Sequence, residues 1–195
     1  MKKVICVYSS SSCALDEVYF NIAYKLGCEI AKRGDILLFG GGMTGLMGET
    51  ARAVHESKGR VVGIIPKALN VSGIVYERCD ELVETSGMRE RKAIMDERSD
   101  AFIALPGGYG TLEELLEIIT LKQLAYHDKP IVIINENNYY DNLLEQFDKI
   151  IHEKFAKPQC KELYFVTSSV FQALEYIDSY KPMELAEKWL TDVGK

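Results

Sequence analysis

Short apolar runs alternate with longer amphipathic stretches along the chain, and this order most constrains the fold. Seven runs rich in β-branched and aromatic residues predict strands at Lys3–Tyr8, Ile36–Phe39, Val61–Ile65, Glu81–Thr85, Ala101–Leu105, Ile131–Asn135 and Tyr164–Thr167. Most of these runs are apolar from end to end, which is typical of parallel strands that are covered on both faces. The runs therefore favour a buried parallel sheet.

The stretches between these runs predict helices. From Val18 to Ile30 an apolar residue recurs at every fourth position, which marks one face of a helix. Alternating strands and helices indicate an α/β fold, a doubly wound and mostly parallel sheet of about seven strands with helices on both faces. Since no linker or repeat interrupts the pattern, residues 1–195 are predicted to form one domain. The further predicted helices are Leu46–Ser57, Met88–Arg98, Leu112–Tyr126, Tyr140–Phe155, Val170–Ser179 and Met183–Thr191.

The charge balance excludes some classes of partner. The chain of 195 residues carries 23 basic and 29 acidic side chains, which gives a net charge of −6. Such a surface offers no basic footprint, so neither nucleic acid nor an anionic membrane is an expected partner. No apolar run approaches the roughly 20 residues that cross a bilayer, and the N-terminal run is too short for a signal peptide.

The cysteines and histidines indicate a cytoplasmic protein without a metal site. The five cysteines are odd in number and widely spaced, a pattern that favours free thiols over disulfide bonds. The three histidines show no metal-ligand spacing. We therefore expect no bound metal and no cofactor.

Three of the predicted strands end in loops of small residues. The first strand leads into Ser9–Ser12, the second into Gly40–Gly48, and the fifth into Pro106–Glu114. In a doubly wound sheet, ligands bind beyond the carboxyl ends of the strands, at the point where strand order reverses. Three such loops at one edge therefore predict an anion site that is lined by backbone groups.

The loop Pro106–Glu114 combines glycines with the start of a helix. Glycines let backbone N–H groups approach a ligand closely, and the N-terminus of the helix attracts a phosphate. Thr111 is predicted as the N-cap, and its hydroxyl is also available to the anion. Thr111 to Glu114 match a capping box as well, in which Glu114 bonds back to the N–H of Thr111. This position would favour the ionised carboxylate, and spacing alone does not decide between capping and catalysis.

Two other segments carry weaker signals. Gly40, Gly42 and Gly45 match the dinucleotide fingerprint, but the next strand ends at Ile65-Pro66-Lys67 without the acid that would hold an NAD ribose. A mononucleotide or sugar-phosphate cradle is favoured over plain turn glycines. Charged residues at the start of the helix at Met88 are either a solvated face or, through arginine, a contact for phosphate or carboxylate.

Taken together, these motifs resemble the Lonely Guy family of cytokinin riboside 5′-monophosphate phosphoribohydrolases. The segment Met88-x-x-Arg91-Lys92 is followed by Pro-Gly-Gly-x-Gly-Thr-x-x-Glu, and its first residue, Pro106, comes fifteen positions after Arg91. Gly40–Gly48 is similar to a further family segment. The resemblance extends from about Lys3 to Tyr180.

The resemblance implies a homodimer with a Rossmann-like fold that acts on a nucleoside 5′-monophosphate. It would hydrolyse the N-glycosidic bond of an N6-modified adenosine 5′-monophosphate to the free base and ribose 5-phosphate. Arg91 and Glu114 match the catalytic pair of the family. The residues expected to bind substrate and phosphate are Ser11, Gly41, Gly42, Gly45, Lys92, Gly107, Gly108, Tyr109, Gly110, Thr111, Leu112 and Glu113.

Two departures from the family pattern concern recognition of the base. Ser10 stands where the family usually has glycine, and Gly73 stands where many plant members have glutamate, so that contact is missing or comes from elsewhere, such as Glu77. Three other functions compete with hydrolysis: a non-catalytic nucleotide or molybdopterin carrier, an NAD-dependent dehydrogenase and a pyridoxal decarboxylase. The hydrolase is favoured because the NAD ribose acid is missing and no lysine is placed as a Schiff base.

Overall fold

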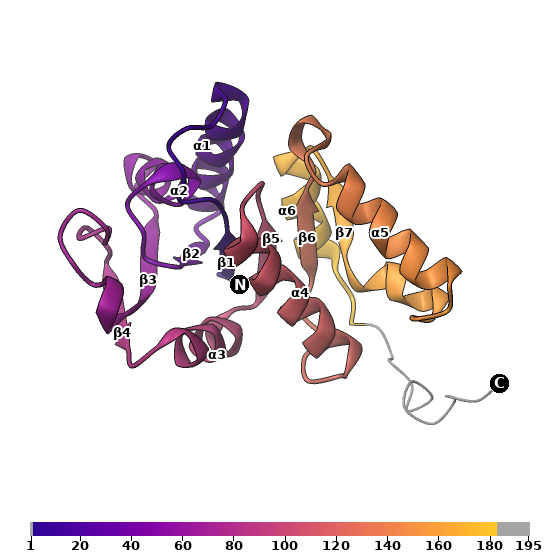
Figure 1. The fold of residues 1–195 in the computed structure, drawn as a ribbon. Helices are drawn as coiled ribbons and strands as arrows, with labels where there is room; N and C mark the ends of the chain where they lie inside the picture. Colours follow the sequence, from indigo (N-terminus) through magenta and orange to yellow (C-terminus); the bar gives the residue numbers. More distant parts are fainter. Residues whose placement is uncertain (1, 183–195) are drawn as a thin grey trace.

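The computed structural model, which describes residues 2–182, has one parallel sheet at its centre (Figure 1). Its strand order is β4-β3-β2-β1-β5-β6-β7, and all neighbouring strands are parallel. The predicted doubly wound α/β class is confirmed, and each predicted strand agrees with an observed one to within one residue at either end. The strands are Val4–Tyr8 (β1), Ile36–Phe39 (β2), Arg60–Pro66 (β3), Glu81–Thr85 (β4), Ala101–Ala104 (β5), Ile131–Ile134 (β6) and Phe165–Thr167 (β7).

Helices join successive strands. One predicted helix starts too late, because α4 begins at Tyr109 and not at Leu112, and it ends at Gln123. The predicted helix Met183–Thr191 lies outside the described residues. None of the described helices has the length and apolar character needed to cross a bilayer. The helices are Glu17–Lys32 (α1), Gly45–Glu56 (α2), Met88–Arg98 (α3), Tyr109–Gln123 (α4), Asp141–His152 (α5) and Val170–Ser179 (α6), with short 3-10 turns at Lys67–Leu69, Glu136–Asn138 and Pro158–Leu163.

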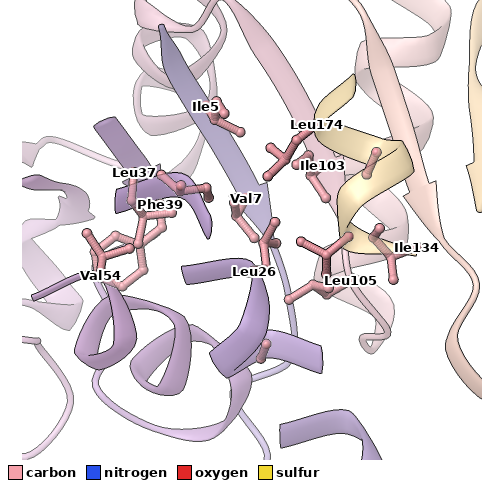
Figure 2. Packing of buried hydrophobic residues seen from close by; sticks show 14 of the residues in the cluster. Ile5, Val7, Leu26, Leu37, Phe39, Val54, Ile103, Leu105, Ile134 and Leu174 are labelled. Carbon is pink, nitrogen blue, oxygen red and sulfur yellow. The ribbon is translucent and has the colours of Figure 1, made fainter. Parts of the chain in front are cut away.

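Alternate residues of each strand face two separate apolar layers. Ile5 and Val7 of β1 pack in the layer that α1, α2 and α6 cover, and Figure 2 shows this layer with Leu26 and Leu174. Cys6, the residue between them, belongs to the layer under α3, α4 and α5. Each fully buried aliphatic side chain contributes about 1.5–3 kcal/mol relative to an exposed one. Burial on both faces explains why the strand sequences are apolar without alternation.

Strand order reverses at the centre of the sheet. β1 pairs with β2 on one side and with β5 on the other, and the chain continues outward in both directions. This topology leaves a crevice beyond the carboxyl ends of β1 and β5. The loops that follow β1, β2 and β5 are therefore neighbours at one edge, as the sequence predicted.

Candidate active site

The loop after β1 lies directly against the start of α2. The N–H of Met47 donates to the carbonyl of Ser10 (3.2 Å), and Gly45 has a φ of +59°. A Cβ on Gly45 would lie 2.5 Å from the carbonyl carbon of Ser11. Glycine is therefore needed at position 45 both for its backbone conformation and for this close approach. It brings the exposed Ser11 to the edge of the crevice.

The glycines after β2 form backbone contacts that stabilise their own loop. Gly42 forms an antiparallel bridge with Val75, and Tyr76 donates its N–H to the carbonyl of Gly41 (2.8 Å). The N–H of Met43 donates to the carbonyl of residue 74 (2.8 Å). These bonds hold residues 71–76 over the glycine loop and give Gly41 and Gly42 a structural role. Contact of either glycine with a phosphate stays a prediction.

The start of α4 differs from the prediction. Gly108 is the N-cap, so Thr111 lies inside the first turn, and no side chain caps the helix. The predicted N-cap at Thr111 and its capping box are therefore wrong. The side chain of Thr111 is instead buried against Gly107, where an added Cβ would fall within 3.0 Å of its hydroxyl oxygen. The glycine run misled the prediction because the helix starts within it.

Backbone donors of this first turn face an open edge. An α-helix leaves its first N–H groups without acceptors inside the helix, and these groups carry the positive end of the helix dipole. Open space surrounds Gly108 and Gly110, and Tyr109 is 93% exposed. Leu112 is half-buried and Glu113 is exposed. The turn thus has the geometry of an anion site, with its donors accessible from outside.

Two consecutive tyrosines fix the loop that precedes α4. The hydroxyl of Tyr139 donates to the carbonyl of Gly107 (2.7 Å), and that of Tyr140 donates to the carbonyl of Leu105 (2.7 Å). The two rings pack edge to face. Sequence reasoning missed these hydroxyl bonds, although the tandem pair after a strand is a visible signal.

Arg91 of α3 and Glu114 of α4 meet in the layer beneath the crevice. Nη2 of Arg91 lies 3.3 Å from Oε1 of Glu114, and the two side chains are 10% and 9% exposed. Nε of Arg91 donates to the carbonyl of Ile64 on β3 (3.1 Å), and Nη1 lies 3.6 Å from the sulfur of Met88. The structure thus brings together the two residues that the sequence predicted as catalytic. The Ile64 carbonyl, a backbone group, had no sequence signal.

The environment of Glu114 is the main electrostatic feature of the site. Burial raises the pKa of Glu114 to about 7, and the positive charge of Arg91 partly opposes that rise. The expectation that the helix N-terminus would keep this carboxylate ionised is therefore wrong, since loss of hydration outweighs the dipole. A carboxyl group that titrates near neutral pH is suited to exchange a proton during a reaction.

Lys92, the neighbour of Arg91, is engaged by two carboxylates of α4. Its Nζ lies 2.9 Å from Oε2 of Glu117 and pairs with Glu113. Hydrogen bonding to Glu113 raises the pKa of Lys92. These contacts tie α3 to α4 beside the Arg91–Glu114 pair. Glu117 was missed, although it lies four residues after Glu113 on one helix face.

Among the described residues, no group of three or more histidine, cysteine, aspartate or glutamate side chains is placed to hold a metal ion. The described cysteines are free thiols. Burial raises the pKa of Cys6, which lies on β1 in the layer of the Arg91–Glu114 pair, to about 12, so this thiol stays protonated. The charged chemistry of the site therefore belongs to the arginine, the glutamates and the lysine.

Comparison with known proteins identifies the family. A family model described as "Possible lysine decarboxylase" matches residues 47–177. Cytokinin riboside 5′-monophosphate phosphoribohydrolase LOG5 of Arabidopsis thaliana is 42% identical over 181 residues, 93% of this chain and 79% of the relative. LOG3 of the same plant, with the same enzyme name, is 43% identical over 178 residues, 91% of this chain and 83% of the relative. The chain belongs to the Lonely Guy family.

The Lonely Guy resemblance expected from the motifs is thus confirmed over most of the chain. Among solved structures, a molybdenum cofactor binding protein from the phototrophic bacterium Rippkaea orientalis has a TM-score of 0.71 and 26% identity, covering 92% of this chain and 97% of that one. A molybdenum cofactor carrier protein from Chlamydomonas reinhardtii, 24% identical, has a TM-score of 0.69 over 91% and 97% of the two chains. These neighbours share the Rossmann-like fold.

Proposed function

We propose that the protein hydrolyses the N-glycosidic bond of an N6-modified adenosine 5′-monophosphate, releasing the free base and ribose 5-phosphate. The observation that carries the proposal is the buried Arg91–Glu114 pair, one helical turn from an open helix N-terminus. The names of relatives that are 42–43% identical support the same reaction. In this proposal Glu114 acts on the glycosidic bond, and the N-terminus of α4 binds the 5′-phosphate.

The 5′-phosphate binds at the first turn of α4. The N–H groups of Tyr109, Gly110 and Thr111 are free of intrahelical acceptors, and the open space at Gly108 and Gly110 lets an anion reach them. Ser11 and Gly45 bring the loop after β1 and the start of α2 to the same edge. Binding energy at this remote group orients the ribose for reaction.

Glu114 acts on the anomeric carbon. It follows Thr111 by three residues, which places it about 4.5 Å further along the helix axis. That separation is comparable to the span of ribose 5-phosphate from its phosphorus to its anomeric carbon. As the base leaves, positive charge develops on the ribose, and the ionised carboxylate stabilises it or takes a proton from the attacking water.

Arg91 serves as a clamp on Glu114. A guanidinium group stays charged at neutral pH and does not give up a proton. Its bond to the Ile64 carbonyl fixes the guanidinium, and its charge favours the ionised form of Glu114 against the effect of burial. Lys92 holds Glu113 and Glu117 in the same region and contributes positive charge near the phosphate.

The alternatives lack comparable support. A non-catalytic carrier would not need a buried carboxyl group that titrates near neutral pH beside the phosphate site. The third strand ends at Pro66 without an acid for an NAD ribose. For a pyridoxal decarboxylase, the fully buried Lys122 lies about 12 Å further along α4 than Glu114, away from the anion site.

We also propose that the protein is a single-domain, cytoplasmic homodimer, with the face of α4 and α5 as the interface. α5 has an apolar side but no completely buried residue, and Phe155 after it is 85% exposed. A second copy would cover this face, and the free cysteines suit the cytoplasm. A largely apolar cavity of about 170 Å³ on this face includes Leu116, Ile119, Phe147, Ile150 and Leu163 in its lining.

The test is chromatography of products after incubation with purine and pyrimidine 5′-monophosphates beside the corresponding ribosides. We expect base and ribose 5-phosphate from purine monophosphates, with N6-modified adenosine monophosphates cleaved fastest, and little release from ribosides. Equal release from ribosides would contradict the phosphate-anchored site. Tight binding of nucleotides without release of base would identify a carrier instead.

A further inference from the structure

Gly40, the first residue after β2, lies against the guanidinium group of Arg91. A Cβ added to Gly40 would fall within 3.0 Å of Nη2, closer than real Cβ atoms approach, and 3.0 Å from Cζ. The third-nearest atom is Nε of the same side chain, at 3.5 Å. The space that a side chain at position 40 would fill is therefore the space that this guanidinium occupies.

The backbone does not require glycine at this position. Gly41 and Gly45 have φ values of +76° and +59°, in the left-handed region that disfavours other residues. Gly40 is not among the glycines with positive φ. A positive φ therefore does not exclude alanine here, and the three atoms nearest to its methyl group would all belong to Arg91.

Three contacts hold the guanidinium in its place. On β3, the Ile64 carbonyl holds Nε, while Nη2 faces Glu114 and Nη1 faces the sulfur of Met88. A methyl group at position 40 would push Nη2 from its place, and the 3.3 Å approach to Glu114 would lengthen. Because the obstructing atoms lie at the end of a flexible side chain, the fold itself would survive.

We propose that Gly40 is a positioning residue for the reaction: its missing side chain lets the Arg91 guanidinium lie where it orients Glu114. The expected effect of Gly40 on kcat rests on the proposed function. The glycine loop after β2 thus helps to position the Arg91–Glu114 pair, and this role is separate from any contact with phosphate.

Displacement of Arg91 has a consequence for proton binding at Glu114. Burial favours the protonated form of this carboxyl group, and the charge of Arg91 opposes burial, so moving the guanidinium away raises the pKa of Glu114 above about 7. Lys92, which also lowers this pKa, and Glu113 and Glu117, which raise it, stay in place. The titratable and charged groups facing Glu114 are Arg91 and Lys92 on α3, Glu113 and Glu117 on α4, and Tyr8 and Cys6 on β1.

The experiment compares Gly40→Ala with Gly87→Ala. Gly87 precedes α3, has extended backbone and has open space where a Cβ would stand, so it provides the matched control. We expect Gly40→Ala to lower kcat by at least about tenfold and to move the acid limb of the pH profile to higher pH. Gly87→Ala should stay within about twofold of the wild type in kcat. Wild-type kcat and pH profile in Gly40→Ala would overturn the proposal.

Two further measurements separate this proposal from the proposed function. In the Arg91→Ala background, Gly40→Ala should cost nothing more in kcat, because the obstructing group is gone. An additional loss there would show that Gly40 acts through something else. Titration of the Glu114 carboxyl group by NMR needs no substrate: a raised pKa in Gly40→Ala supports the positioning role even if no nucleotide is cleaved, and an unchanged pKa contradicts it.

Discussion

At the N-terminus of α4, Gly108 and Gly110 face open space, whereas one turn further along the same helix Glu114 is 8% exposed and paired with Arg91. The first region offers backbone donors that need only to be unobstructed. The second is a buried pair in which loss of hydration disfavours the ionised carboxylate and the charge of Arg91 favours it. Substitutions in the first region should therefore weaken substrate binding, whereas substitutions in the second should lower turnover.

The largest effect is expected from Glu114→Gln. The amide keeps the shape of the side chain but neither accepts a proton nor stabilises developing positive charge as a carboxylate does. We expect kcat to fall by about 10²- to 10⁴-fold. Calorimetric titration should show that the nucleotide still binds, because the first turn of α4 is unchanged. Wild-type release of base by this variant would remove Glu114 from the mechanism.

A pair of glycine substitutions contrasts packed and open positions within the first region. Gly107→Ala places a methyl group against the buried side chain of Thr111, so we expect a loss of about 1–3 kcal/mol in the free energy of unfolding and a higher KM. Gly110→Ala meets nothing and lies within the helix, so stability should rise by up to about 1 kcal/mol.

Urea denaturation of the two variants measures this difference. If both variants lost stability equally, the contact between residue 107 and Thr111 would not be what fixes the start of α4. The wild type and both variants should keep the same denaturant dependence, since neither change alters the surface that unfolding exposes.

Glu114→Gln should also change how stability depends on pH. Burial raises the folded-state pKa of Glu114 from 4.5 to about 7. The stability linked to this protonation is complete below the unfolded pKa and is lost as pH rises through the folded value. The glutamine variant escapes that loss, so it should be more stable than the wild type at pH 8 by about 1–3 kcal/mol, and the difference should shrink toward pH 4. A difference independent of pH would contradict the burial of an ionisable group.

The smallest effect is expected from Lys92→Met. The lysine pairs with Glu113 and Glu117, whose side chains are 56% and 40% exposed. Although the Lys92 side chain is only 15% exposed, ion pairs with such solvated carboxylates contribute little, so the free energy of unfolding should change by less than about 1 kcal/mol. Thermal unfolding at low and high salt would check this. A loss of several kcal/mol would mean that these pairs hold α3 against α4.

The strands could be predicted closely because burial on both faces leaves a continuous apolar signal, as in β6, where all four residues are buried. The start of α4 could not be predicted in the same way. Thr111 and Glu114 match a capping box by spacing, but the helix begins within the glycines before them. Local sequence patterns do not show which of two nearby starts tertiary packing selects.

For the site, sequence motifs predicted the partners Arg91 and Glu114 but not their surroundings. The pKa of Glu114 depends on burial beneath α3 and β1, which no local pattern encodes. In the same way, the motif contained Gly40, but only the structure shows that the guanidinium of Arg91 occupies the place of its side chain. Contacts between residues far apart in the sequence could not be predicted from the motifs.

The most direct test of the account is the pH dependence of kcat/KM for release of base from an N6-modified adenosine 5′-monophosphate. In the proposed mechanism the ionised carboxylate of Glu114 is the active form, so kcat/KM should rise with pH through a limb near pH 7. This limb should be absent from the residual activity of Glu114→Gln. A wild-type profile that stays flat between about pH 5.5 and 8.5, or a limb that persists in Glu114→Gln, would contradict the role of Glu114.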